Sequence, residues 1–132
     1  MAAIANKKGF NCGGTLVASK WIVSAAHCFF KDAGRTDKPY TPDELKVILG
    51  DHDKSKTEDS DITITIRIEG FTIHPQYNGY VRGKDIALVK LAEEVDLKMY
   101  APACIANTRD TFTGKNAWVY GENLYFQMLL IF

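Results

Sequence analysis

Hydrophobic and polar positions alternate most strictly over residues 62–68, where four isoleucines are separated by two threonines and an arginine. Successive side chains of a strand point to opposite faces, so this alternation predicts a β-strand with one apolar face. The apolar pattern continues to Ile73, and Pro75 follows. Because proline has no amide hydrogen to donate, we expect strand pairing to end there.

Shorter apolar runs, each bounded by glycine, proline or polar residues, predict further strands. The sequence at 6–9 predicts a hairpin turn, and Ala25–Phe29 predicts a helical turn. Many short strands with little helix signal favour an all-β sandwich or barrel. The additional predicted strands cover residues 1–6, 10–17, 21–24, 45–50, 85–91 and 117–120.

Composition and charge narrow the classes of function. The chain has 132 residues, enough for one domain with a core. It carries 16 basic and 16 acidic side chains, a balance that favours neither nucleic acid nor a membrane surface as partner. No apolar run approaches the roughly 20 residues of a membrane span, and the first residues do not read as a signal peptide.

Three segments carry candidate chemistry. In residues 21–28 a short apolar run leads through two alanines to His27 and Cys28. Cys12 and two glycines stand upstream, and Asp85 opens an apolar run downstream. In this order the three motifs resemble those of the trypsin-like (chymotrypsin-family) serine proteases. The resemblance covers about the first half of that family's catalytic domain and implies the first of its two six-stranded antiparallel barrels.

The resemblance also implies catalytic roles. In this family a serine is the nucleophile, a histidine is the general base, and an aspartate orients the histidine. His27 matches the base and Asp85 matches the orienting carboxylate. Taken singly, a histidine before a cysteine is more often structural, and an aspartate opening a strand is often a cap. The occurrence of all three motifs in family order favours the catalytic roles.

The sequence offers no candidate for the nucleophile, because none of the serines in this chain lies in the family's Gly-Asp-Ser-Gly-Gly motif. The resemblance implies that a second barrel supplies this serine, the oxyanion hole and the specificity pocket. We therefore expect no peptide hydrolysis by this chain alone. The four serines are Ser19, Ser24, Ser55 and Ser60.

Cys12 and Cys28 match the family's disulfide around the histidine loop. In the chain-entropy model such a bridge stabilises the folded state by about 3 kcal/mol. It also implies that the parent protein is secreted. Two buried free thiols are the alternative. Cys104 is left unpaired, as a free thiol or as the link of a dimer; in many relatives a cysteine in this context pairs with the zymogen's amino-terminal segment. His52 and His74 are interpreted as structural or surface residues.

The acidic segment 51–61 offers a calcium site, since hard cations prefer oxygen ligands. The resemblance to calcium-binding trypsins implies side-chain and backbone oxygens as ligands, although an acidic loop is more often simply solvated. The family requires no other cofactor. The implied ligands are Asp51, Asp53, Lys56, Glu58 and Asp61.

Residues 122–127 read Glu-Asn-Leu-Tyr-Phe-Gln. This is the recognition sequence of a viral cysteine protease used to remove tags, so we exclude it from fold reasoning. Residues 1–121 then form the barrel. The apolar tail at 128–132 has no counterpart in the family and is either vector-derived or an added strand or plug.

The sequence thus predicts a fragment of a secreted serine endopeptidase that acts on protein substrates, carrying the histidine and aspartate without the serine. A rival prediction is a non-catalytic barrel that binds or self-associates, because a barrel without its partner barrel exposes an apolar patch. A third is one half of a split enzyme, with a second chain supplying the serine.

Overall fold

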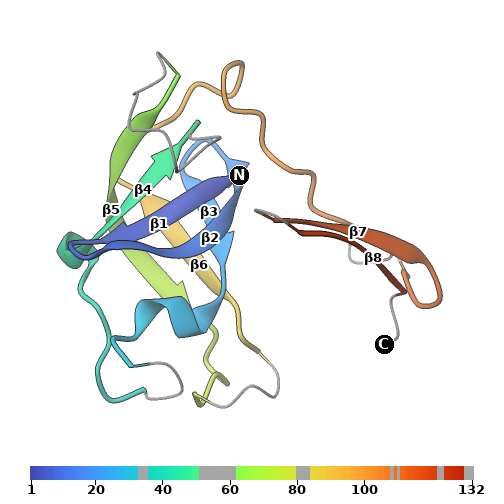
Figure 1. Ribbon diagram of the computed structural model, residues 1–132, viewed down its shortest axis with the longest axis horizontal. Coiled ribbons are helices and arrows are strands. Elements are labelled where there is room, and N and C mark those ends of the chain that lie inside the picture. The colour runs from blue at the N-terminus through green and yellow to red at the C-terminus, as the bar shows by residue number, and fades with distance from the viewer. Residues whose placement is uncertain are drawn as a thin grey trace.

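A computed structural model describes residues 1–32, 36–50, 62–79, 84–107, 109, 111–121 and 124–129, with side chains except at 10, 11, 117–121 and 124–129. Six strands form a closed antiparallel barrel in the order β1-β2-β3-β6-β5-β4 (Figure 1). The all-β, six-stranded barrel prediction is confirmed. The strands are β1 (Ala2–Asn6), β2 (Gly9–Ala18), β3 (Trp21–Ser24), β4 (Leu45–Leu49), β5 (Ile64–Ile73) and β6 (Ala87–Leu91).

Closure of the barrel follows from two pairings between strands that are distant in sequence. β1 pairs with β4 as well as with β2, and β3 pairs with β6. Each of the six strands therefore has two neighbours, so the barrel presents no open edge that could pair with another chain.

Alternating apolar residues fill the barrel interior. Along β4, Leu45, Val47 and Leu49 are buried while the residues between them are not. Phe29 is fully buried, and its ring centroid lies 4.5 Å from that of Phe71 on β5. Contact of the buried Phe29 with the partly buried Phe71 anchors the turn after β3 to β5.

Two strands begin two residues later than predicted, and the other predicted boundaries agree with the structure within one residue. β5 begins at Ile64 rather than at residue 62. β6 begins at Ala87 rather than at Asp85, because a tight turn precedes it: Lys84 has φ of 63°, and the Ile86 N–H donates to the Lys84 carbonyl at 2.8 Å. Asp85 therefore lies in a turn and not in the sheet.

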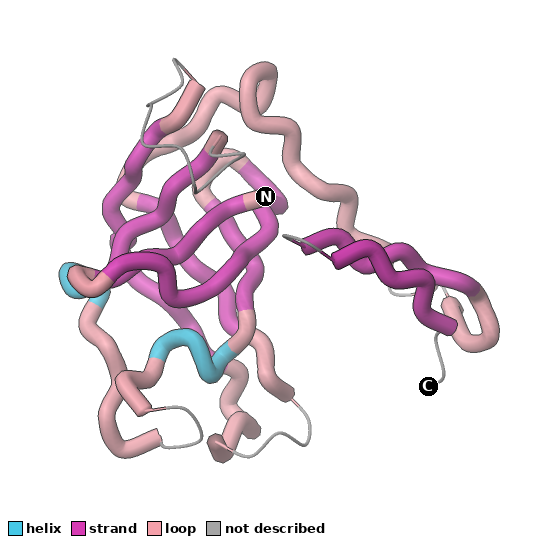
Figure 2. The backbone as a smooth tube through the Cα atoms, viewed as in Figure 1, coloured by secondary structure: helices cyan, strands magenta, loops and turns pink. Residues whose placement is uncertain are grey.

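A second, two-stranded sheet lies outside the barrel (Figure 2). It pairs β7 (Asn116–Gly121) with β8 (Leu124–Leu129) in antiparallel fashion. The predicted strand at 117–120 is confirmed. β8 consists of residues 124–127, which we interpreted as part of a tag and for which we predicted no strand, and of residues 128 and 129, for which an added strand was one of the alternatives.

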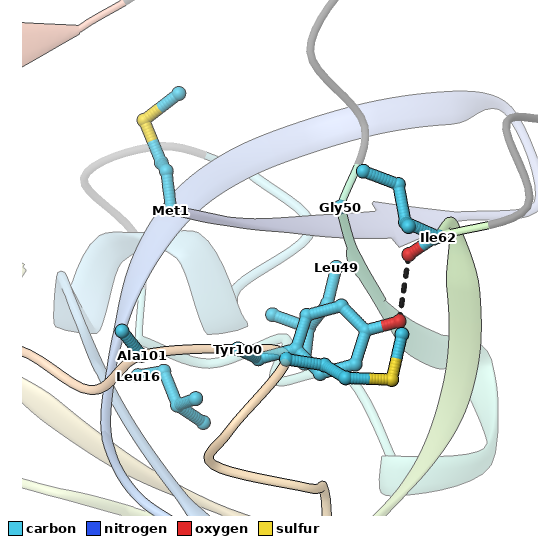
Figure 3. A pocket seen from close by; sticks show the side chains of 8 residues that line it. Met1, Leu16, Leu49, Gly50, Ile62, Tyr100 and Ala101 are labelled. Carbon is cyan, nitrogen blue, oxygen red and sulfur yellow. Dashed lines mark hydrogen bonds between the residues drawn. The ribbon is translucent and has the colours of Figure 1, made fainter.

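One end of the barrel is hollowed into a cavity of about 400 Å³, shown in Figure 3. Tyr100 and Ile62 both line this cavity, and the Tyr100 hydroxyl donates to the Ile62 carbonyl at 2.6 Å. Gly50 lies at its rim with φ of 81°, and a Cβ there would overlap the Ile62 carbonyl. This corner therefore requires glycine. Within the described part of the chain, no helix has the length and hydropathy of a membrane span.

Candidate active site

His27 is presented by a short turn that follows β3. The 3₁₀ turn η1 (Ala26–Phe29) buries three of its residues and leaves the His27 side chain 48% exposed. β3 pairs with β6 so that Ser24 lies opposite Ala87. This register brings Asp85, two residues before Ala87, beside the start of η1. The barrel thereby joins two residues that are 58 positions apart.

The Asp85 carboxylate contacts both the ring and the backbone N–H of His27. The His27 Nδ1 lies 2.8 Å from Asp85 Oδ2, and the His27 backbone N–H donates to Oδ1 at 2.9 Å. The Ala26 N–H also interacts with this carboxylate. Ala25, at the N-cap of η1, has no side-chain acceptor to offer. Asp85 therefore supplies the missing cap from a distant segment of the chain.

These contacts determine the charge of Asp85. Partial burial raises the pKa of this carboxyl, but hydrogen bonds from the His27 ring, the His27 backbone and the Ala26 N–H outweigh it, so the pKa lies below its ordinary value. An ionised carboxylate can only accept hydrogen bonds. Nδ1 therefore carries the hydrogen, and a neutral His27 keeps its lone pair on Nε2, the arrangement of a general base.

Tyr77 is a neighbour that the sequence analysis did not single out. Burial and the nearby Asp85 charge both raise the pKa of its phenol. Its ring stacks on that of Phe30, with centroids 5.8 Å apart. The phenol consequently stays neutral at physiological pH. Only its place in a loop with a second tyrosine distinguished it in the sequence.

Cys12 and Cys28 form a disulfide, as predicted. Their sulfurs lie 3.9 Å and 3.6 Å from the Nε2 atom of His27. Cys104 is exposed and free. The bridge thus ties η1 to β2 directly beside the imidazole.

The remaining candidates fall into two groups. Ser24 is 8% exposed, and its hydroxyl donates to the Gly13 carbonyl at 2.8 Å. It therefore has a structural role, linking β3 to β2. His74 is half-buried, and its Nδ1 accepts the Gln76 N–H at 3.1 Å, a structural role. The second group lies outside the described residues and consists of Ser55, Ser60, His52 and the calcium candidates Asp51, Asp53, Lys56, Glu58 and Asp61.

A barrel of this topology, with a His–Asp pair beside a disulfide, is the arrangement expected of a trypsin-like protease. The model of the Trypsin family matches residues 1–127, and the chain belongs to this family. The match also covers the six residues interpreted as a tag.

Relatives of known name agree with this membership. A venom serine protease of Polistes dominula is 38% identical over 98 residues, which are 74% of this chain and 33% of the relative. Mannan-binding lectin serine protease 1 of Homo sapiens is 33% identical over 101 residues, 71% of this chain and 14% of the relative. The inactive serine protease PAMR1 of Pongo abelii is 36% identical over 103 residues, 77% of this chain and 14% of the relative. The chain thus spans a third or less of each of these proteins.

Proposed function

We propose that this chain carries the general base and its orienting carboxylate for a secreted serine endopeptidase. His27 is the base, and Asp85 fixes its tautomer and orientation. The observation that carries the proposal is the 2.8 Å contact between His27 Nδ1 and Asp85 Oδ2, which leaves Nε2 as the basic atom of a half-exposed imidazole.

The chemistry assigned to the pair is proton transfer during acyl transfer from a peptide bond to water. Nε2 takes the proton of an attacking serine hydroxyl as its oxygen bonds to the peptide carbonyl carbon. The Asp85 carboxylate, hydrogen-bonded to Nδ1, stabilises the imidazolium that forms. Nε2 then returns the proton to the leaving amine. The positive charge therefore develops next to a carboxylate that is already ionised.

In this proposal residues 1–121 belong to the protease, with strands β1 to β6 as its first barrel and β7 outside that barrel. Residues 122–127 are the tag, 128–132 are the tail, and the serine comes from a second barrel. The engagement of Ser24 with the Gly13 carbonyl supports this. Alone, the chain then hydrolyses no peptide. Supplied with a second chain that bears the serine, it becomes half of a split enzyme.

Labelling with a fluorophosphonate probe, which requires an activated serine, tests the proposal. By intact mass under non-reducing conditions, we expect no adduct on this chain alone. Addition of a second-barrel chain should restore labelling on that chain, and His27→Ala in the first chain should abolish it. A stoichiometric adduct on this chain alone, lost in Ser24→Ala, would show that a resident serine is the nucleophile.

A non-catalytic binding or self-assembling module is the second candidate. A shallow groove of about 270 Å³ lies over the outer face of β3, β5 and β6, where Ile86 is 47% and Leu88 38% exposed. One relative is named as an inactive protease. Sedimentation distinguishes the candidates: a concentration-dependent dimer that Leu88→Lys dissociates supports the module, whereas a monomer at all concentrations argues against homo-oligomerisation.

Secretion and calcium binding complete the proposal. The disulfide supports secretion, because such bridges persist in oxidising compartments. The acidic composition of residues 51–61 supports calcium binding. Calorimetry should show binding of Ca²⁺ that is lost in Glu58→Gln, and an absence of heat at millimolar Ca²⁺ removes this part of the proposal.

A further inference from the structure

The disulfide and the imidazole place three metal-ligating atoms in one small volume. His27 Nε2 and the sulfurs of Cys12 and Cys28 all lie within 4.8 Å of one another. As a disulfide the two sulfurs are not thiolates and do not ligate a metal ion as thiolates do. Reduction converts this group into two thiols and an imidazole, a donor set that soft divalent ions prefer.

We propose that the dithiol form of the folded chain binds one Zn²⁺ through Cys12 Sγ, Cys28 Sγ and His27 Nε2, with the fourth position open to water. The site is distinct from the proposed proteolytic function, since it needs no serine and no second barrel. It is also incompatible with that function, because the metal occupies the nitrogen that acts as the base.

The distances fit tetrahedral coordination. With Zn–S of about 2.3 Å and Zn–N of about 2.0–2.1 Å, tetrahedral angles give about 3.6 Å between the nitrogen and each sulfur. The structure has 3.6 Å to Cys28 Sγ and 3.9 Å to Cys12 Sγ. Only the two sulfurs need to move apart, to about 3.8 Å, once the bond between them is broken.

The surroundings of the imidazole match those of histidine ligands in metal sites. Such histidines usually donate their other ring hydrogen to a carboxylate, which fixes the tautomer and raises the basicity of the ligating nitrogen. Asp85 accepts from Nδ1 at 2.8 Å and therefore leaves the lone pair on Nε2, the ring nitrogen that lies 3.6 Å from Cys28 Sγ.

The three donors are held by the fold as well as by the disulfide, and they can be reached from solvent. Cys12 lies on β2, where it pairs with Ile4 of β1, and Cys28 lies on η1 with its side chain in the core. The His27 side chain is 48% exposed. An ion can therefore enter past the imidazole while the backbone of both cysteines stays in place.

The conversion balances with a phosphine as reductant. The phosphine and one water reduce the disulfide to two thiols, and the phosphine becomes its oxide. Zn²⁺ then displaces the two thiol protons. Bound Zn²⁺ should accordingly delay re-formation of the disulfide in air.

The test uses the full chain with Cys104→Ser, so that the third cysteine cannot contribute. After reduction with a phosphine and its removal without oxygen, Co²⁺ is titrated as a spectroscopic probe and then displaced by Zn²⁺. We expect one ion per chain, a thiolate-to-cobalt absorption band, and retention of the β-sheet circular dichroism. The oxidised chain should give no band. A reduced chain that shows no band, or that binds only after losing its β-sheet signal, overturns the proposal.

Asp85→Asn separates the folded site from binding by an unfolded chain, in which a residue so distant in sequence would have no influence. We expect Zn²⁺ affinity about 10–100-fold weaker than in the parent. Asp43→Asn removes the same charge from an exposed position and should leave the affinity unchanged. His27→Gln should remove the nitrogen ligand and weaken binding further. Equal affinities for the Asp85 and Asp43 variants, or an unaffected His27 variant, would contradict the site.

Discussion

The two 3₁₀ turns among the described residues are each capped by a carboxylate that also contacts a basic side chain, but one carboxylate is close in sequence to its turn and the other is distant. In η2 (Pro42–Glu44), Glu44 accepts the Thr41 N–H at 2.9 Å and the Lys31 ammonium at 2.7 Å. In η1, the capping carboxylate is Asp85, 58 residues from His27.

The difference lies in what must fold first. The Glu44 cap needs only the residues of its own turn, so it is a local structure. The Asp85 cap exists only when β3 and β6 are paired, because their register brings the two segments together. The orientation of His27 therefore depends on closure of the barrel, whereas the conformation of η2 does not.

The largest expected effect comes from removing the covalent tie of η1. Replacing both Cys12 and Cys28 with alanine should lower the free energy of unfolding by about 3 kcal/mol, because the bridge closes a loop with a sequence separation of 16. Urea unfolding followed by circular dichroism measures this. As a control, hydrogen exchange of the η2 amides at low urea should be the same in this double variant as in the parent chain. Faster exchange in both η1 and η2 would show that the two turns are not independent.

Removing the long-range cap comes next. Asp85→Ala leaves the N–H groups of Ala26 and His27 without their acceptor and should cost about 2 kcal/mol. Asp85→Asn keeps an acceptor oxygen and should cost less. Urea midpoints of the two variants give the comparison. Equal stabilities of the alanine variant and the parent chain would mean that Asp85 does not cap η1.

The local cap should give the smallest effect, best seen as a pH dependence. The Lys31 side chain, followed by the Thr41 backbone N–H, lowers the pKa of Glu44 to about 2. Because the folded pKa is below the usual 4.5, the contribution of Glu44 to stability is present above pH 4.5 and is lost as the pH falls towards 2. NMR titration should show a midpoint near this value, and Lys31→Ala should raise it. An unchanged midpoint in Lys31→Ala would exclude the lysine as the main cause.

The same local-versus-distant contrast explains what could be predicted from the sequence. Strict alternation in residues 62–68 and Pro75 identified most of β5, because these signals are local. The turn that keeps Asp85 out of β6 was missed, since a positive φ at Lys84 has no marker such as glycine. No strand was predicted at residues 124–127 because that segment was excluded on its motif, whereas the structure pairs it with β7.

The candidate site was predicted only through its resemblance to a family. Nothing local in the sequence says that Asp85 contacts His27, and Tyr77 carries no motif at all. Pairing of β3 with β6 creates the His–Asp contact, and burial together with the Asp85 charge gives Tyr77 its raised pKa. Such properties arise from tertiary packing, which single-residue patterns do not encode.

The most direct test of the central claim, that the barrel alone builds an oriented His–Asp pair, is the tautomer of His27. Nitrogen NMR of histidine-labelled chain at about pH 9, where imidazole side chains are neutral, should show the hydrogen on Nδ1. Asp85→Ala should move it to Nε2, the form that free imidazole prefers. A hydrogen on Nε2 in the unsubstituted chain would contradict the claim, because His27 would then have no lone pair at the atom assigned as the base.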